Sequence, residues 1–215
     1  MKRAILLLST ALVLAFTSCG GAEPEIAQLA WQLNYRLDPQ LEDVYEELSV
    51  FLHISDEDGV DDIENIHIIH DTSELYWTLN ENNWHVSDRS DEYWIGSNTI
   101  RNQDYSELPR GGYRLLVTDT AGERTEEAIF IAPDKEADPD SFPEIIEDEG
   151  TYSLHAPLGA AELWSIDSNN AFRDRIGSLA DTSSLNAQIR PGLRVLLYSY
   201  HSETNTGYIT GPYEY

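Results

Sequence analysis

The stretch Leu108-Pro109-Arg110-Gly111-Gly112-Tyr113-Arg114-Leu115-Leu116-Val117-Thr118-Asp119 decides the fold of this 215-residue chain. It has the form Leu-x-x-Gly-x-Tyr and leads into an apolar segment, Tyr113 to Thr118, that is typical of a β-strand. Thr120-Ala121-Gly122-Glu123 follows as a turn, and Ala128 to Ile131 returns as a second strand. The stretch therefore predicts a β-hairpin.

Short strands with turn signals between them continue on the N-terminal side of this hairpin. Apolar residues recur with a period of two in Glu47 to Ser55, and Ile63 to His70 is rich in β-branched isoleucine. We predict strands at Glu47 to Ser55, Ile63 to His70, Leu75 to Leu79, Trp84 to Val86, Tyr93 to Ile95, Tyr113 to Thr118 and Ala128 to Ile131. One helical turn is predicted, at Pro39 to Glu46. Because no long helical pattern alternates with the strands, residues 28 to 133 favour a β-sandwich.

The Leu108 to Tyr113 motif resembles the tyrosine corner of immunoglobulin-like and fibronectin type III-like domains. In those domains the tyrosine hydroxyl bonds to the main chain a few residues upstream and fixes a Greek-key crossing. The resemblance implies that Arg114 to Asp119 and its hairpin are the last two strands of such a domain. The buried cysteine pair common in that family is missing here. The resemblance implies a fold and is silent about activity.

The C-terminal third of the chain is predicted to form a smaller β domain. Residues 134 to 149 are acidic and interrupted by proline, which indicates a semi-extended linker. Residues 150 to 215 form the smaller domain, either a shortened sandwich or a barrel, and its size favours packing against the first domain. Its predicted strands are Tyr152 to Ala156, Ala161 to Ile166, Leu185 to Ile189, Leu193 to Tyr200 and Tyr208 to Thr210.

The N-terminus carries the pattern of an export signal over residues 1 to 18. Two basic residues precede an apolar run, Ala4 to Phe16, that is too short to span a bilayer. The run ends in Phe16-Thr17-Ser18-Cys19-Gly20, which resembles the lipobox of bacterial lipoproteins, relaxed as in spirochaetes because phenylalanine stands where leucine is usual. The resemblance implies that Cys19 is lipidated and that residues 19 to 27 form a tether. The protein would then be anchored in a bacterial cell envelope, in an outer or periplasm-facing membrane.

An ordinary secretory signal cut near Ser18 is the alternative, and it would leave Cys19 as a free thiol. Cys19 is the only cysteine, so lipidation would leave the mature protein without disulfides, thiolate metal ligands or a cysteine nucleophile. Its stability would then depend on the core.

The charge of the chain excludes one class of partner. Its 39 acidic and 13 basic residues give a formal net charge of −26, and removing Lys2 and Arg3 with the signal makes it −28. Such a surface repels nucleic acid and anionic lipid headgroups, and it favours solubility or cationic partners. Membrane attachment is therefore expected through the lipid alone.

No catalytic or cofactor motif is present, and no cofactor is expected. His67 and His70 have opposite parity in a predicted strand, so they point to opposite faces and do not chelate together. A calcium site is a weak candidate in the acidic turn around Gly59, where the spacing fails the EF-hand pattern and a polar hairpin tip is favoured. The candidate calcium ligands are Asp56, Asp58, Asp61 and Asp62.

Aromatic residues give the candidate binding patch, which consists of Trp84, Tyr93 and Trp94. Trp77 alternates in phase with two leucines and is predicted to lie in the core. Trp84 and Trp94 stand among polar residues, where core packing and an exposed binding surface are both open.

Two functions of different class follow. The favoured one is a lipid-anchored, non-enzymatic binding or structural module with an envelope protein or glycan as partner. The alternative is an envelope glycan hydrolase that uses paired carboxylates, which would need two carboxyl groups about 5 to 9.5 Å apart and one raised pKa.

Overall fold

The computed structural model describes residues 21–57, 59–87, 93–132, 136–168, 172–179, 185–186 and 188–215. The predicted signal and Cys19 lie outside these residues. Strands dominate the described part, and the predicted all-β class is confirmed. No helix in the described part has the length and apolar character to cross a bilayer.

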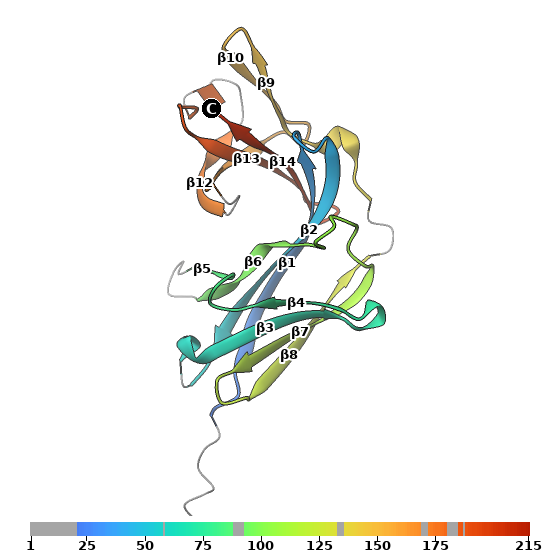
Figure 1. Ribbon diagram of the computed structural model, residues 1–215, viewed down its shortest axis with the longest axis vertical. Coiled ribbons are helices and arrows are strands. Elements are labelled where there is room, and N and C mark those ends of the chain that lie inside the picture. Colours follow the sequence, from blue (N-terminus) through green and yellow to red (C-terminus); the bar gives the residue numbers. More distant parts are fainter. Residues whose placement is uncertain are drawn as a thin grey trace, which may run out of the picture. The chain divides into compact units, whose positions relative to one another are not determined.

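Among the residues that the structure describes, fourteen strands are assigned, together with short 3-10 turns, and Figure 1 shows their arrangement. The strands are β1 (Glu25–Asp38), β2 (Asp43–Ser55), β3 (Ile63–His70), β4 (Leu75–Leu79), β5 (His85–Ser87), β6 (Trp94–Ile100), β7 (Gly111–Asp119), β8 (Arg124–Ile131), β9 (Glu144–Asp148), β10 (Thr151–His155), β11 (Ala161–Ile166), β12 (Phe172–Leu179), β13 (Arg194–His201) and β14 (Thr206–Glu214). The turns are η1 (Val60–Asp62), η2 (Asp71–Ser73) and η4 (Pro139–Ser141).

The order of the first eight strands is that of an immunoglobulin-like domain. One sheet has the order β4-β3-β7-β8, and the other contains the run β1-β2-β6-β5 (Figure 1). The strands β1 to β8 take the letters A, B, C, C′, D, E, F and G of that fold in chain order. The two sets are then its C′-C-F-G and A-B-E-D sheets. The predicted immunoglobulin-like Greek-key sandwich is therefore confirmed.

Alternate residues of the strands form the core of the sandwich. Ile66 and Ile68 of β3 and Leu115 and Val117 of β7 are fully buried, while the residues between them are more exposed. Successive strand residues point to opposite faces, so one apolar set lines the inside of the sandwich. Each such side chain stabilises the fold by about 1.5 to 3 kcal/mol relative to exposure.

Tyr113 lies near the start of β7, where the tyrosine corner of the family is found. It is only 1% exposed, and its ring lies 4.8 Å from that of His70 and 6.2 Å from that of Trp77. Trp77, predicted to lie in the core, is half-buried against this ring. The motif that decides the fold thus contributes a central aromatic of the core.

The chain forms two compact units whose limits differ from the predicted domains. The first combines the chain up to Leu29 with Leu52–Gly96 and Gly112–Ile129; the second combines Ala30–Phe51, Ser97–Gly111 and Phe130–Tyr215. The difference arises because β1 and β2, of 14 and 13 residues, contribute to both units.

A long sheet of the order β12-β11-β13-β14-β1-β2-β6 runs through the second unit. Its C-terminal strand β14 pairs in parallel with β1, from Leu33 opposite Thr206 to Leu37 opposite Thr210. Residues 150 to 215 therefore complete their sheet with strands from the N-terminal part of the chain.

The helical turn expected at Pro39 to Glu46 is wrong. Residues 39–42 form turns, in which the Asp38 carboxylate accepts from the Gln40 amide at 2.8 Å, and β2 begins at Asp43. An Asx turn of this kind competes with helix formation.

The strand expected at Leu185 to Ile189 is also wrong. The amides of Gln188 and Ile189 both donate to the Leu185 carbonyl, as in a helical turn, and Leu185 is fully buried. One buried leucine anchors this segment, so no alternating face is needed. The unpredicted strand β12 pairs with β11 instead.

The segment predicted as an acidic linker holds secondary structure. It contains η4, in which the Asp138 carboxylate accepts from Asp140 and Ser141, and the strand β9. Phe142 is buried there, with its ring edge-on to Tyr208 at 5.2 Å. One buried aromatic thus fixes a stretch whose composition is typical of a linker.

Candidate functional site

Two neighbouring glutamates of β2 carry buried charges in the second unit. Glu46 and Glu47 are 4% and 1% exposed. Because they are adjacent in a strand, their side chains point to opposite faces of the sheet. Each carboxylate is paired with arginine.

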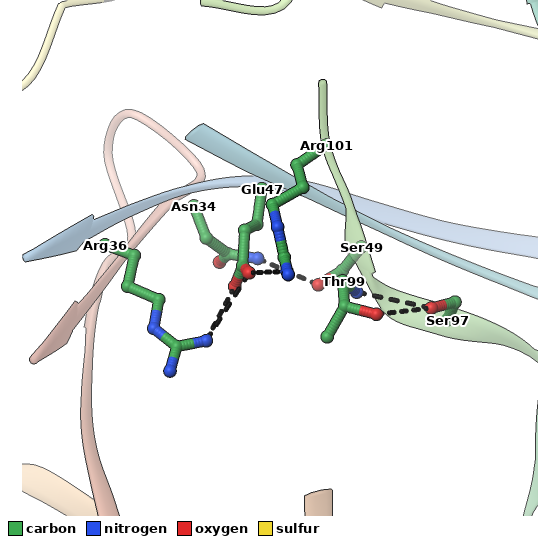
Figure 2. A network of polar contacts seen from close by, with 7 residues as sticks. All are labelled: Asn34, Arg36, Glu47, Ser49, Ser97, Thr99 and Arg101. Carbon is green, nitrogen blue, oxygen red and sulfur yellow. Dashed lines mark hydrogen bonds and ion pairs between the residues drawn. The ribbon is translucent and has the colours of Figure 1, made fainter. Parts of the chain in front are cut away.

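Glu47 lies between two guanidinium groups, as Figure 2 shows. Its Oε1 lies 2.7 Å from Nη1 of Arg101 and 3.4 Å from Nη1 of Arg36. The Arg36 side chain is as deeply buried as Glu47, whereas Arg101 reaches the surface. Burial alone would lower the pKa of Arg101, but the Glu47 carboxylate, together with Tyr45 and Tyr105, outweighs it, so the pKa of Arg101 is raised.

Polar residues of the neighbouring strands extend this network (Figure 2). The Asn34 amide of β1 donates to the Ser49 hydroxyl at 2.8 Å, and the Ser97 hydroxyl accepts from the Thr99 amide at 3.2 Å. One face of β1, β2 and β6 is therefore polar even where it is buried.

Glu46 is hydrogen-bonded to Leu108 and Arg110, at the start of the stretch that decides the fold. Its carboxylate accepts from the Leu108 amide at 2.8 Å and from both terminal nitrogens of Arg110 at 2.8 and 2.6 Å. These hydrogen bonds raise the pKa of Arg110. The bidentate pair fixes the entry to β7 and keeps both charges in place.

A pocket of about 430 Å³ opens beside Glu46, within the size range of small-ligand sites. Three tyrosines, three carboxylates and one arginine dominate its lining. The lining residues are Tyr35, Val44, Tyr45, Glu46, Tyr105, Glu107, Arg110, Glu136 and Ala137. We call this site the Tyr105 pocket.

Tyr35 lines the pocket and holds an unused polar atom in the protein interior beside it. The residue is 2% exposed, and its buried hydroxyl has no hydrogen-bond partner among the described residues. Burial, aided by the Glu46 carboxylate, raises the pKa of Tyr35, so the hydroxyl stays neutral. A buried, unsatisfied hydroxyl costs about 1 to 3 kcal/mol, which a bound ligand or water would offset.

Tyr105 stands at the mouth of the pocket in a strained conformation. Its φ is +59°, in the left-handed region that side chains other than glycine rarely adopt, and its ring is 43% exposed. The ring packs edge-on to Tyr45 at 4.8 Å and lies 5.3 Å from the Arg101 guanidinium.

The loop that carries Tyr105 is held by its own side chains. Asp104 accepts from both the amide and the hydroxyl of Ser106, which lowers the pKa of Asp104. The Asn102 amide donates to the Ser106 and Glu107 carbonyls. A rigid loop therefore presents an exposed ring, and such local strain is characteristic of functional sites.

The candidate patch from the sequence lies elsewhere, at β5 and β6. Trp84 and Trp94 are half-buried, and Tyr93 is exposed. The Trp94 ring stacks on the His53 ring at 5.7 Å, so part of its surface is used inside the protein. Residues 88 to 92, between the two tryptophans, lie outside the described part. The patch stays a prediction.

Two of the four candidate calcium ligands lie in a short 3-10 turn. Asp61 and Asp62 lie in η1, where Asp62 accepts from the Thr120 hydroxyl, and Asp58 lies outside the described residues. Among the residues that the structure describes, no group of three or more potential ligands comes together. His70 is buried, whereas His67 is half-buried and bonds to Thr78 at 3.0 Å. The predicted opposite orientation of the two histidines agrees with this burial.

Sequence reasoning missed Glu46, Glu47 and the arginines that pair with them. With 39 acidic residues, no single glutamate stands out by composition. One signal was available, because Glu46 is in phase with the buried residues Leu48 and Val50 of β2. A charge on the apolar face of a strand indicates a buried pair.

No family model and no curated protein matches the chain. A chain of the solved structure "Crystal structure of Dpr11 IG1 bound to DIP-gamma IG+IG2" is similar at 10% identity and a TM-score of 0.24, over 88% of this chain and 98% of that chain. So slight a likeness carries no argument about ligand or partner. The immunoglobulin-like fold follows from the order of the strands.

Proposed function

We propose that this protein is a non-enzymatic binding module and that the Tyr105 pocket is its ligand site. The observation that carries the proposal is the exposed ring of Tyr105 at the pocket. The backbone of this residue is held in a left-handed conformation. Strain of this kind costs about 1 to 3 kcal/mol and persists where the surrounding structure imposes it. A loop under selection for stability alone would favour glycine or asparagine at this position.

The paired carboxylates of the described residues support binding over hydrolysis. A glycan hydrolase needs a carboxylic acid of raised pKa. The buried carboxylates Glu46 and Glu47 are instead paired with arginines. Three other carboxyl groups, those of Asp71, Asp104 and Asp138, have a lowered pKa because each accepts side-chain hydrogen bonds. Fixed ion pairs suit a preorganised binding surface.

The binding test replaces Tyr105 in the anchored, full-length protein. Tyr105→Asn removes the ring and tolerates the left-handed backbone, so the fold should survive. A side chain at the centre of an interface often contributes 2 kcal/mol or more, and we therefore expect about a thirtyfold weaker capture of the ligand from the cell envelope.

The matched control is Tyr76→Asn, which removes an exposed tyrosine of β4 in the other unit. It should capture the ligand as well as the unchanged protein does. Equal capture by Tyr105→Asn, or equal loss in both variants, would show that the ligand site lies elsewhere.

Anchoring is a separate part of the proposal. The signal pattern before Cys19 supports export and lipidation, which would hold the protein on a bacterial envelope membrane. Cys19→Ala should move the protein from the membrane fraction to the soluble fraction. A variant that still sediments with membranes would contradict the lipid anchor and leave the binding module untouched.

A further inference from the structure

We infer that the Tyr105 pocket binds an alkylammonium group, supplied by a lysine side chain of a partner protein or by a free diamine. The inference rests on the proposed function and names the chemistry of its ligand. Its basis is the charge, the aromatic lining and the unused acceptor of one pocket.

The carboxylates outnumber the cations in the lining. Arg110 is committed to Glu46 by two short hydrogen bonds, which leaves Glu107 and Glu136 as excess negative charge. Both are exposed, and neither forms an ion pair with another described residue. A cation that enters here meets two carboxylates available to accept its N–H groups.

The aromatic lining suits the stem as well as the charge of an alkylammonium ion. Tyr105 and Val44 are exposed at the mouth and offer apolar surface to a methylene chain. An ammonium group over a tyrosine face gains further attraction from the electrons of the ring. A neutral alkyl chain would use the apolar surface alone, and an anion would be repelled.

Tyr35 adds a buried, unused acceptor beside these carboxylates. It has no described partner, and it belongs to a residue that lines the pocket. An ammonium group carries three N–H donors and no acceptor, so it suits a site that offers carboxylates and no free donor charge. The formal net charge of −26 adds a long-range attraction for cations and a repulsion of anions.

The test is a calorimetric titration of the purified protein, without its signal, at low salt. The probes are 1,5-diaminopentane, a peptide with one central lysine and blocked ends, and the same peptide with norleucine in place of lysine. At least one amine should bind, and the norleucine peptide should bind at least about tenfold more weakly, since it lacks the charge.

Charge at the site is tested with a double variant and a matched control. Glu107→Gln with Glu136→Gln should weaken amine binding by about tenfold or more. Glu64→Gln with Glu127→Gln removes the same charge from exposed positions in the other unit and should leave amine binding within about twofold.

The results test the alkylammonium inference and the proposed binding function separately. Tighter binding of the lysine peptide supports a protein partner, and tighter binding of the diamine supports a free amine. Measurable and equal binding of the lysine and norleucine peptides, or equal loss of amine binding in both double variants, overturns the alkylammonium inference. If no amine binds while Tyr105→Asn still loses its envelope ligand, the inference fails and the binding module stands.

Discussion

At the scale of single residues, the unusual feature is a pair of adjacent buried glutamates that serve opposite faces of β2. Removing a carboxylate from water costs several kcal/mol unless its partners are well placed. Glu46 offsets this cost with Arg110 and the Leu108 amide, and Glu47 with Arg36 and Arg101. A buried pair of this kind adds little net stability over apolar residues of similar volume, yet breaking it is costly.

Loss of the Glu47 charge should be costly because Arg36 would stay buried without its counter-charge. We expect Glu47→Gln to lower the free energy of unfolding by about 3 to 5 kcal/mol, measured by urea denaturation. Glu126→Gln is the control, since its pair with Arg114 is solvent-exposed and contributes about 0 to 1 kcal/mol. Similar small losses in both variants would show that the Arg36 charge reaches water.

Tyr113 tests the motif that decides the fold. Its hydroxyl is buried with the rest of the side chain at the start of β7. If the tyrosine corner forms, Tyr113→Phe should lower the free energy of unfolding by about 1 to 3 kcal/mol, because the main-chain partner of the hydroxyl loses its hydrogen bond. An unchanged unfolding midpoint would mean that the ring alone matters here and that no tyrosine corner forms.

At the scale of elements, sequence periodicity predicted the strands that have one apolar face. Ile63 to His70 and Leu75 to Leu79 match β3 and β4, and the final hairpin matches β7 and β8. It failed for β1, because residues 33–36 are buried on both faces and have no period of two. Periodicity also did not predict the acidic strand β9, because a short hairpin strand needs little apolar surface.

The Tyr105 pocket could not be predicted by the same reasoning. Tyr35, Tyr45 and Tyr105 come from β1, β2 and the loop after β6, and only strand pairing brings them together. The parallel pairing of β1 with β14 joins residues that are distant in the sequence, such as Leu33 and Thr206. Local patterns carry no information about such pairing.

The β1–β14 pairing depends on the absence of a side chain at Gly207. A Cβ atom there would lie 2.0 Å from Oδ1 of Asn34 and 2.8 Å from the Tyr198 ring. Asn34 is buried and hydrogen-bonded to Ser49, so it has little freedom to move. We expect Gly207→Ala to lower the free energy of unfolding by about 1 to 3 kcal/mol, measured by urea denaturation.

Gly177→Ala serves as the control for this change. The nearest atom to its added Cβ would be Nε2 of Gln188 at 3.9 Å, so the alanine fits and should be neutral or slightly stabilising. Adding Asn34→Ala to Gly207→Ala should recover part of the loss. A Gly207→Ala protein as stable as the unchanged one would show that β14 shifts away from β1 at little cost.

At the scale of the whole molecule, charge opposes folding. The 39 acidic and 13 basic residues repel one another on balance, and compaction brings the excess carboxylates closer together. Exposed pairs such as Arg114–Asp71 and Arg194–Glu214 contribute little in return. Salt weakens both the repulsion among the carboxylates and the attraction within these ion pairs, but the summed repulsion is larger.

Salt should therefore stabilise the protein. Raising sodium chloride from about 0.01 to 0.15 M shortens the screening length from about 30 to about 8 Å. If the repulsion relieved is about 1 kcal/mol, Tm should rise by about 2 to 4 °C, measured by circular dichroism at neutral pH.

Potassium chloride should act equally, because screening depends on ionic strength and not on the identity of the cation. A variant with Glu64, Glu81 and Glu127 changed to Gln, all exposed, should start from a higher Tm and gain less from salt. A fall in Tm with salt would mean that the ion pairs outweigh the repulsion.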